Sequence, residues 1–175
     1  MIRAIILAAI FMTTWAVVFG QSAGKKPDKD DLAKKAIVAL AREFADALVN
    51  RDAVAADRIL EEDYMDFSNG IPNTKFLLLR ALKELPANYP RPEAINLDDS
   101  LNLVRFYDNT AVLRTKITLK YHGSKEDLDK KWKMLLPMFD EYAVTLVAVK
   151  RNGNWQIVST NESVWDFKFQ ISPQR

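Results

Sequence analysis

Residues 139–165 read FDEYAVTLVAVKRNGNWQIVSTNESVW and predict a β-hairpin. Two runs rich in β-branched residues flank the tetrapeptide RNGN at residues 151–154. Asn-Gly between such runs is the strongest short-range hairpin signal, because both residues tolerate the positive φ of a tight turn. The second strand begins at Trp155, and the hairpin fixes the end of an antiparallel sheet. The stretch therefore indicates a fold more firmly than it indicates a catalytic activity.

In the segment before this hairpin, every second residue is expected to face the same side, as in a β-strand. One face is expected to carry Leu113, Thr115, Ile117, Leu119 and Tyr121, and the other Arg114, Lys116, Thr118 and Lys120. An earlier strand is expected from Leu101 to Tyr107, with a turn at Asp108–Asn109.

The N-terminal half has helical spacing instead. Apolar residues recur every three or four positions from Leu32 to Leu48, and Asp30 or Asp31 can cap this helix. A short helix over residues 53–60, a strand over residues 64–67 and a third helix capped by Thr74 follow, and prolines end the last. Helices first and strands afterwards predict an α+β fold.

One segment between two of the predicted strands has a helical pattern. Ser124–Asp127 resembles a capping box, and Leu128, Trp132, Leu135 and Leu136 form an apolar stripe, so a helical insertion is expected over residues 124–137. It either packs on the sheet edge, or forms a lid or a partner-binding edge.

The first residues have the features of a signal peptide. Arg3 precedes an apolar run from Ala4 to Phe19, which is short for a membrane span and has the length of a signal-peptide core. The prediction is a signal peptide over residues 1–20, a flexible leader over 21–30 and one domain over 31–175. We therefore expect an exported protein, periplasmic or secreted by a bacterium, with no stable membrane span after cleavage. The alternative is an uncleaved N-terminal anchor.

Composition narrows the chemistry. The 175 residues carry a net charge of +2, which indicates no nucleic-acid-binding surface. The chain has no cysteine, which excludes disulfides and thiolate chemistry. Its only histidine, His122, cannot build a histidine-based metal site. No metal and no cofactor are expected.

Three motifs in sequence order carry a resemblance. They are FADALVNRD at residues 44–52, LEEDY at 60–64 with Asn69–Gly70 after it, and NGNWQIV at 152–158 with Ser163. With these motifs the chain resembles the NTF2-like superfamily and, within it, the exported SnoaL-like (DUF4440-type) domains.

The resemblance implies a cone, in which a curved antiparallel sheet wraps around the long N-terminal helix and leaves a pocket at the wide end. It also implies dimerisation through the outer sheet face. Members include ketosteroid isomerase, scytalone dehydratase and domains without chemistry, so the fold does not decide the function. Relatives often carry His-x-Ser near the end of the last strand, where this chain has Asn161–Glu162–Ser163. Ser163 therefore lacks an adjacent base.

The candidate catalytic residues are Asp66 and Tyr64, which are two apart on a predicted strand and share a face. A carboxylate in an apolar cone has a raised pKa and suits a general base, with the tyrosine as hydrogen-bond donor. The alternative is a solvated Asp66 that begins the turn at residues 68–70.

Further residues are candidates for a ligand-binding lining, although each is also compatible with an ordinary core: Phe67, Leu113, Thr115, Ile117, Tyr121, Tyr142, Trp155 and Ser163. The first hypothesis is a non-catalytic domain that binds a small apolar or amphipathic ligand or acts as a homodimeric interaction module. The alternative is a cofactor-free lyase or isomerase that uses Asp66 and Tyr64. A weaker option is an envelope assembly factor whose Trp132 helix binds a partner.

Overall fold

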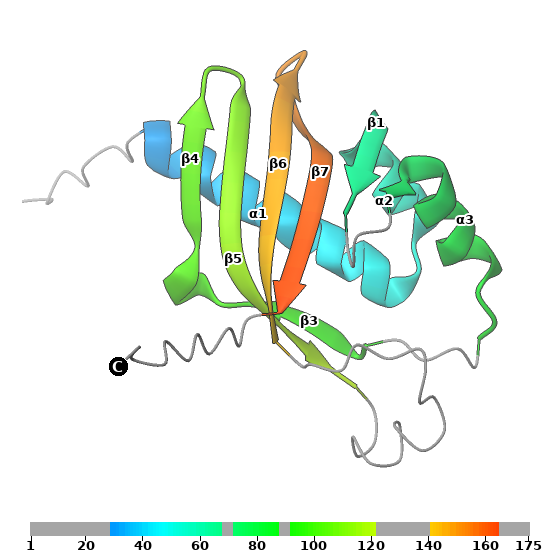
Figure 1. The fold of residues 1–175 in the computed structure, drawn as a ribbon. Coiled ribbons are helices and arrows are strands. Elements are labelled where there is room, and N and C mark those ends of the chain that lie inside the picture. Colours follow the sequence, from blue (N-terminus) through cyan, green and yellow to red (C-terminus); the bar gives the residue numbers. More distant parts are fainter. Residues whose placement is uncertain (1–28, 68–71, 88–91, 122–140, 165–175) are drawn as a thin grey trace, which may run out of the picture.

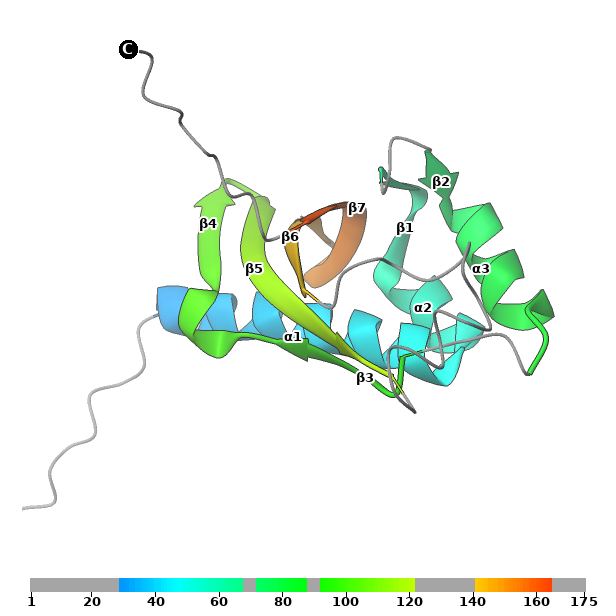
Figure 2. The same cartoon turned by 60° about the horizontal axis from the view of Figure 1, so that its bottom comes forward.

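Helix α1 (Lys29–Asn50) lies against a curved, unclosed sheet of seven strands in the computed structural model (Figure 1). The structure describes residues 29–67, 72–87, 92–121 and 141–164. In Figure 2 the strands arch over α1, and two shorter helices, α2 (Ala53–Ile59) and α3 (Lys75–Glu84), lie at one end of the sheet. The predicted α+β layout with a long N-terminal helix is confirmed.

The predicted hairpin is formed by β6 (Glu141–Arg151) and β7 (Asn154–Val164). Arg151 pairs with Asn154, so the loop has two residues, and both have positive φ: 51° at Asn152 and 86° at Gly153. These values match the type I′ turn that Asn-Gly favours, because its twist agrees with that of the strands.

Strand β5 (Thr110–Lys120) runs antiparallel to β6 and confirms the predicted alternation. Its residues at odd positions from Ala111 to Ile117 are buried, while Arg114 is exposed. Its other edge pairs first with β4 (Leu103–Tyr107) and then with β3 (Ala94–Leu97).

The predicted start of a strand at Leu101 is wrong. Leu101 belongs to a 3₁₀ turn, η2 (Asp99–Leu101), that connects β3 to β4. The Asp98 side chain accepts a hydrogen bond from the Ser100 backbone amide at 3.0 Å, and this local contact competes with strand pairing.

Two short helices follow α1, and a side chain caps each. Asp52 accepts from two amides at the start of α2 (Ala53–Ile59), and Thr74 accepts from the Leu77 amide in α3 (Lys75–Glu84). Lys75 is nearly buried and joins the two helices, since its ammonium binds Asp57 at 2.9 Å and the Leu60 carbonyl at 3.0 Å.

The sheet is mixed, which corrects the prediction of an antiparallel sheet. Strand β1 (Leu60–Asp66) pairs antiparallel with β2 (Asn73–Thr74) but parallel with β7. Alternation along a strand reports which face is buried and is the same in either direction of pairing. Sequence periodicity therefore could not supply this direction.

Several sequence predictions fall on residues outside the described ranges. They are the signal peptide, most of the leader, the 124–137 insertion with Trp132, and His122. Over the ranges that are described, no helix is long and apolar enough to span a membrane.

Candidate functional site

A cavity of about 50 Å³ lies between α1 and the inner face of the sheet. This volume holds roughly four water molecules. A short alkyl chain fits in it, but a fused ring system is too large. The residues lining it are mostly apolar: Ala41, Phe44, Ala45, Leu48, Ile95, Leu97, Leu113, Thr115, Ile117, Val144, Leu146, Thr160 and Glu162.

Helix α1 forms the floor of the cavity. Its contributing positions, 41, 44, 45 and 48, are three and four apart and therefore share one helical face. Two of them are alanines, whose small side chains leave space between helix and sheet. Strand β5 supplies the opposite wall through Leu113, Thr115 and Ile117, at the period of two that a strand requires.

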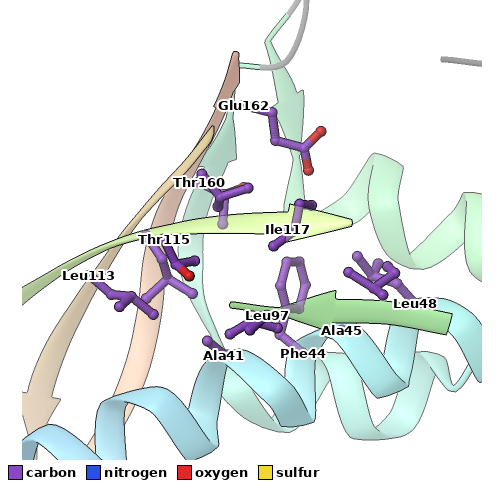
Figure 3. A pocket seen from close by; sticks show the side chains of 13 residues that line it. Ala41, Phe44, Ala45, Leu48, Leu97, Leu113, Thr115, Ile117, Thr160 and Glu162 are labelled. Carbon is purple, nitrogen blue, oxygen red and sulfur yellow. The ribbon is translucent and has the colours of Figure 1, made fainter. Parts of the chain in front are cut away.

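The polar end of the cavity is formed by Thr160 and Glu162 of β7, which we call the rim. Figure 3 shows the Glu162 carboxyl on the sheet side of the cavity, across from Phe44 and Leu48. Glu162 is exposed to solvent on one side, and its carboxyl lines the apolar cavity on the other. Partial removal of that carboxyl from water, and secondly the negative charge of Asp66, raise its pKa to about 7.

Tyr64, Thr160 and Asp66 form a hydrogen-bonded chain behind the rim. The Tyr64 hydroxyl lies 2.7 Å from Thr160 Oγ1, and Thr160 Oγ1 donates to Asp66 Oδ1 at 3.0 Å. Because the threonine hydroxyl has one proton and gives it to the carboxylate, the tyrosine must be the donor in the first bond.

In this hydrogen-bonded chain, the Tyr64 hydroxyl donates its proton to Thr160. Tyr64 is 2% exposed, and its ring packs edge-on against Phe44 with centroids 6.1 Å apart. Burial raises the pKa of Tyr64 well above its usual range, against the opposing effect of the Thr160 hydrogen bond. Tyr64 is therefore neutral and lies one residue behind the cavity wall.

The predicted catalytic pair is brought together, through Thr160, but outside the cavity lining. Asp66 is partly buried and faces the rim from β1. The predicted ligand residues Leu113, Thr115 and Ile117 do line the cavity.

The other predicted ligand residues lie elsewhere. Phe67 is 45% exposed, and Ser163 is exposed. Trp155 packs against Phe106 with ring centroids 6.0 Å apart. Tyr121 and Tyr142 are partly buried and are not among the residues that line the cavity.

Thr160 and Glu162 were not identified from the sequence, because a β-bulge decides which face they occupy. The β6–β7 register shifts between Val147 and Ala148, so that Ile157 and Thr160, three positions apart, both face inward. A strict period of two counted from Ile157 places Ser163 inward in place of Glu162. The raised pKa of a carboxyl beside an apolar cavity is what distinguishes this residue.

No cluster of three or more histidine, cysteine, aspartate or glutamate residues that could hold a metal ion occurs in the described part of the chain.

Solved structures show what this architecture is. An NTF2-like protein from Cytophaga hutchinsonii superposes with a TM-score of 0.59 at 16% identity, over 78% of this chain and 98% of that one. The chain has an NTF2-like fold.

Two further solved structures that this chain resembles have different descriptions. A candidate Ca/calmodulin-dependent kinase II association domain from Exiguobacterium sibiricum has a TM-score of 0.57 at 13% identity, over 80% of this chain and 96% of that one. A candidate ketosteroid isomerase from Parabacteroides distasonis has a TM-score of 0.52 at 16% identity, covering 74% and 86%. No family model matches the sequence, and no curated protein matches it. At these identities the likeness concerns the fold alone.

Proposed function

We propose that this NTF2-like domain binds a small, predominantly apolar ligand in the cavity between α1 and β5, and does no chemistry on it. The observation that supports this is the cavity itself, an apolar space with one polar rim. Such a site buries a hydrocarbon part and orients it by a few polar groups.

The size of the cavity limits the ligand and its affinity. Each buried methylene contributes about 0.8 kcal/mol, so a four-carbon chain gains roughly 3 kcal/mol before the cost of association. Dissociation constants of a millimolar or weaker follow for such a fragment. Tight binding would need contacts beyond the cavity.

The test is a titration of the protein with butan-1-ol, followed by two-dimensional NMR. We expect saturable shifts at the residues that line the cavity. Ala45→Leu fills the space from the α1 side, where Ala45 is 6% exposed, and should abolish these shifts. Ala39→Leu makes the same change at an exposed position of α1 and should bind as the native chain does.

Circular dichroism of both variants excludes unfolding as the cause, since overpacking costs about 1–3 kcal/mol. Unsaturable shifts in the native chain, or equal binding by Ala45→Leu, would refute the ligand-binding function.

A second candidate is proton transfer, as in a cofactor-free lyase or isomerase, and one observation favours it. A carboxyl with a pKa of about 7 beside an apolar cavity suits a general base at neutral pH. In this version Glu162 takes the role expected of Asp66, because the Tyr64–Thr160–Asp66 chain already uses its own protons.

Exchange of the α-protons of butanone in D₂O measures this chemistry directly. The native chain should accelerate the exchange, and Glu162→Gln should remove the acceleration. If the native chain does not accelerate the exchange, proton transfer is refuted and ligand binding is the only function still proposed.

We also propose export and self-association. The apolar N-terminal run supports export, and mass spectrometry of the native protein should show cleavage after Gly20.

Self-association is supported by the half-exposed Leu103 and Tyr107 on β4. Light scattering should give a dimer mass, and Tyr107→Lys should lower it. A monomeric native chain would end the dimer proposal.

A further inference from the structure

The cavity has one charged group among the described residues that line it, and that group is the Glu162 carboxylate. A second carboxylate lies nearby on β1, because Asp66 pairs with Thr160, two residues before Glu162 on β7, and accepts a hydrogen bond from it at 3.0 Å. Its charge repels that of Glu162. Apart from Thr115, whose hydroxyl donates to the Lys116 carbonyl, the remaining faces of the cavity are apolar. They are formed by residues such as Phe44 and Leu48 of α1, Ile117 of β5 and Val144 of β6.

The nearby basic side chains of β5 have acidic partners of their own. Lys116 binds Glu141 at 2.6 Å, and Lys120 lies 3.7 Å from Glu93. Toward the described residues the Glu162 carboxyl makes no hydrogen bond and no ion pair. Among the described residues, Glu162 and Asp66 therefore bring negative charge to the rim, and the apolar walls strengthen its effect on a bound ligand.

We propose that the ligand of this cavity carries a compact cationic head, such as a primary ammonium group, that binds beside Glu162 while its short apolar chain enters the space above α1. The inference rests on the proposed ligand-binding function and specifies the class of ligand.

An ammonium group offsets two unfavourable features of the empty rim. It supplies donors to a carboxylate that has none among the described residues, and it lowers the repulsion between Glu162 and Asp66. A carboxylate ligand would add a third negative charge to the rim, and an alcohol would leave the rim charge as it is. The order expected is ammonium, then alcohol, then carboxylate.

Proton linkage gives a second signature. The cation binds the ionised form of Glu162, whose pKa is about 7 without ligand, and binding must therefore lower that pKa. Affinity for the cation should rise between pH 6 and pH 8, where an alkylammonium group stays protonated. The titratable groups facing Glu162 from β1 are Asp66 and Tyr64, and Tyr64 remains neutral throughout this range.

The experiment compares three probes of equal length, n-butylammonium, butan-1-ol and butyrate, by NMR titration of the full chain. At pH 8 we expect the ammonium to bind at least about tenfold more tightly than the alcohol, as hydrogen bonds to a charged group imply. Glu162→Gln should remove this preference, so that the ammonium and the alcohol bind the variant with similar affinity. Glu84→Gln, the same change at the α3 surface where Glu84 pairs with Arg80, should retain it.

The outcomes separate the two proposals. Butanol or butyrate binding as tightly as butylammonium overturns the cationic ligand and leaves the apolar binding function standing. A failure of all three probes overturns both. If Glu162→Gln does not fold, the pH series on the native chain decides, because an ammonium affinity that stays constant between pH 6 and pH 8 contradicts pairing with Glu162.

Discussion

Truncating Leu113 to alanine tests whether one residue serves both the core and the cavity. Leu113 is 0% exposed and belongs to the central hydrophobic cluster, and it also lines the cavity from β5. Leu113→Ala should therefore lower the stability of the fold and enlarge the binding space together.

The magnitude follows from the atoms removed. Three carbons at about 0.8 kcal/mol each give a transfer loss of roughly 2.4 kcal/mol. Strand β5 is hydrogen-bonded on both edges, so the sheet does not close around the gap and a cavity term is added. Leu→Ala changes at buried sites cost about 2.7–5.0 kcal/mol, and we expect about 4 here. The melting temperature should fall by roughly 8–16 °C for a domain of this size.

Urea denaturation followed by circular dichroism measures the free energy of unfolding. Leu101→Ala is the matched control, because Leu101 is 43% exposed in η2 and its truncation should cost less than about 1 kcal/mol. The native cavity should favour butan-1-ol over hexan-1-ol, and the enlarged cavity of Leu113→Ala should favour hexan-1-ol. A stability loss equal to that of Leu101→Ala would refute the assignment of Leu113 to the core. Continued preference for butan-1-ol would refute its place in the cavity wall.

Three further changes have defined outcomes. Tyr64→Phe removes the donor to Thr160 at 2.7 Å and should cost about 1–2 kcal/mol of unfolding free energy without affecting butanol binding; lost binding would instead place the hydroxyl at the ligand. Gly153→Ala meets no atom within 4 Å but forces alanine to a φ of 86°, which should cost about 1 kcal/mol or more; an unchanged urea midpoint would show that the turn relaxes. Glu162→Gln removes a carboxyl whose pKa rises from 4.5 to about 7 on folding, so the native state holds this proton more tightly than the unfolded state. The native chain should lose stability relative to Glu162→Gln as pH rises from 4.5 to 7, and a constant difference would contradict the shift.

The parts of the fold that the sequence predicted depend on local interactions. Asn152–Gly153 selects its turn from two residues, Thr74 caps its own helix, and the alternation along β5 reflects one strand facing one core. Each signal lies within a dozen positions of the element it predicts. The lining residues on β5, which are Leu113, Thr115 and Ile117, could be predicted for this reason.

The parts of the fold and of the site that the sequence did not predict depend on contacts between distant segments. The bulge opposite Val147 turns Thr160 and Glu162 inward, and nothing in NWQIVSTNES at residues 154–163 marks its place. The parallel direction of β1 and β7 is equally invisible in the alternation of either strand. The rim lies where the bulge in β7 and the parallel β1–β7 pairing come together. Because neither feature is visible in the sequence, Asp66 was selected from the sequence and Glu162 was missed.

The β1–β7 pairing also sets an order of events in synthesis. Asp66 and its partner Thr160 are 94 positions apart, so at 5–20 residues per second the first strand leaves the ribosome roughly 5–20 s before the second. Through this interval β1 has an open edge, and Leu60 and Tyr64 lack the strand that covers them. We expect the nascent chain to depend on a chaperone or an export receptor during this wait, because an unpaired edge with apolar neighbours is a site of aggregation.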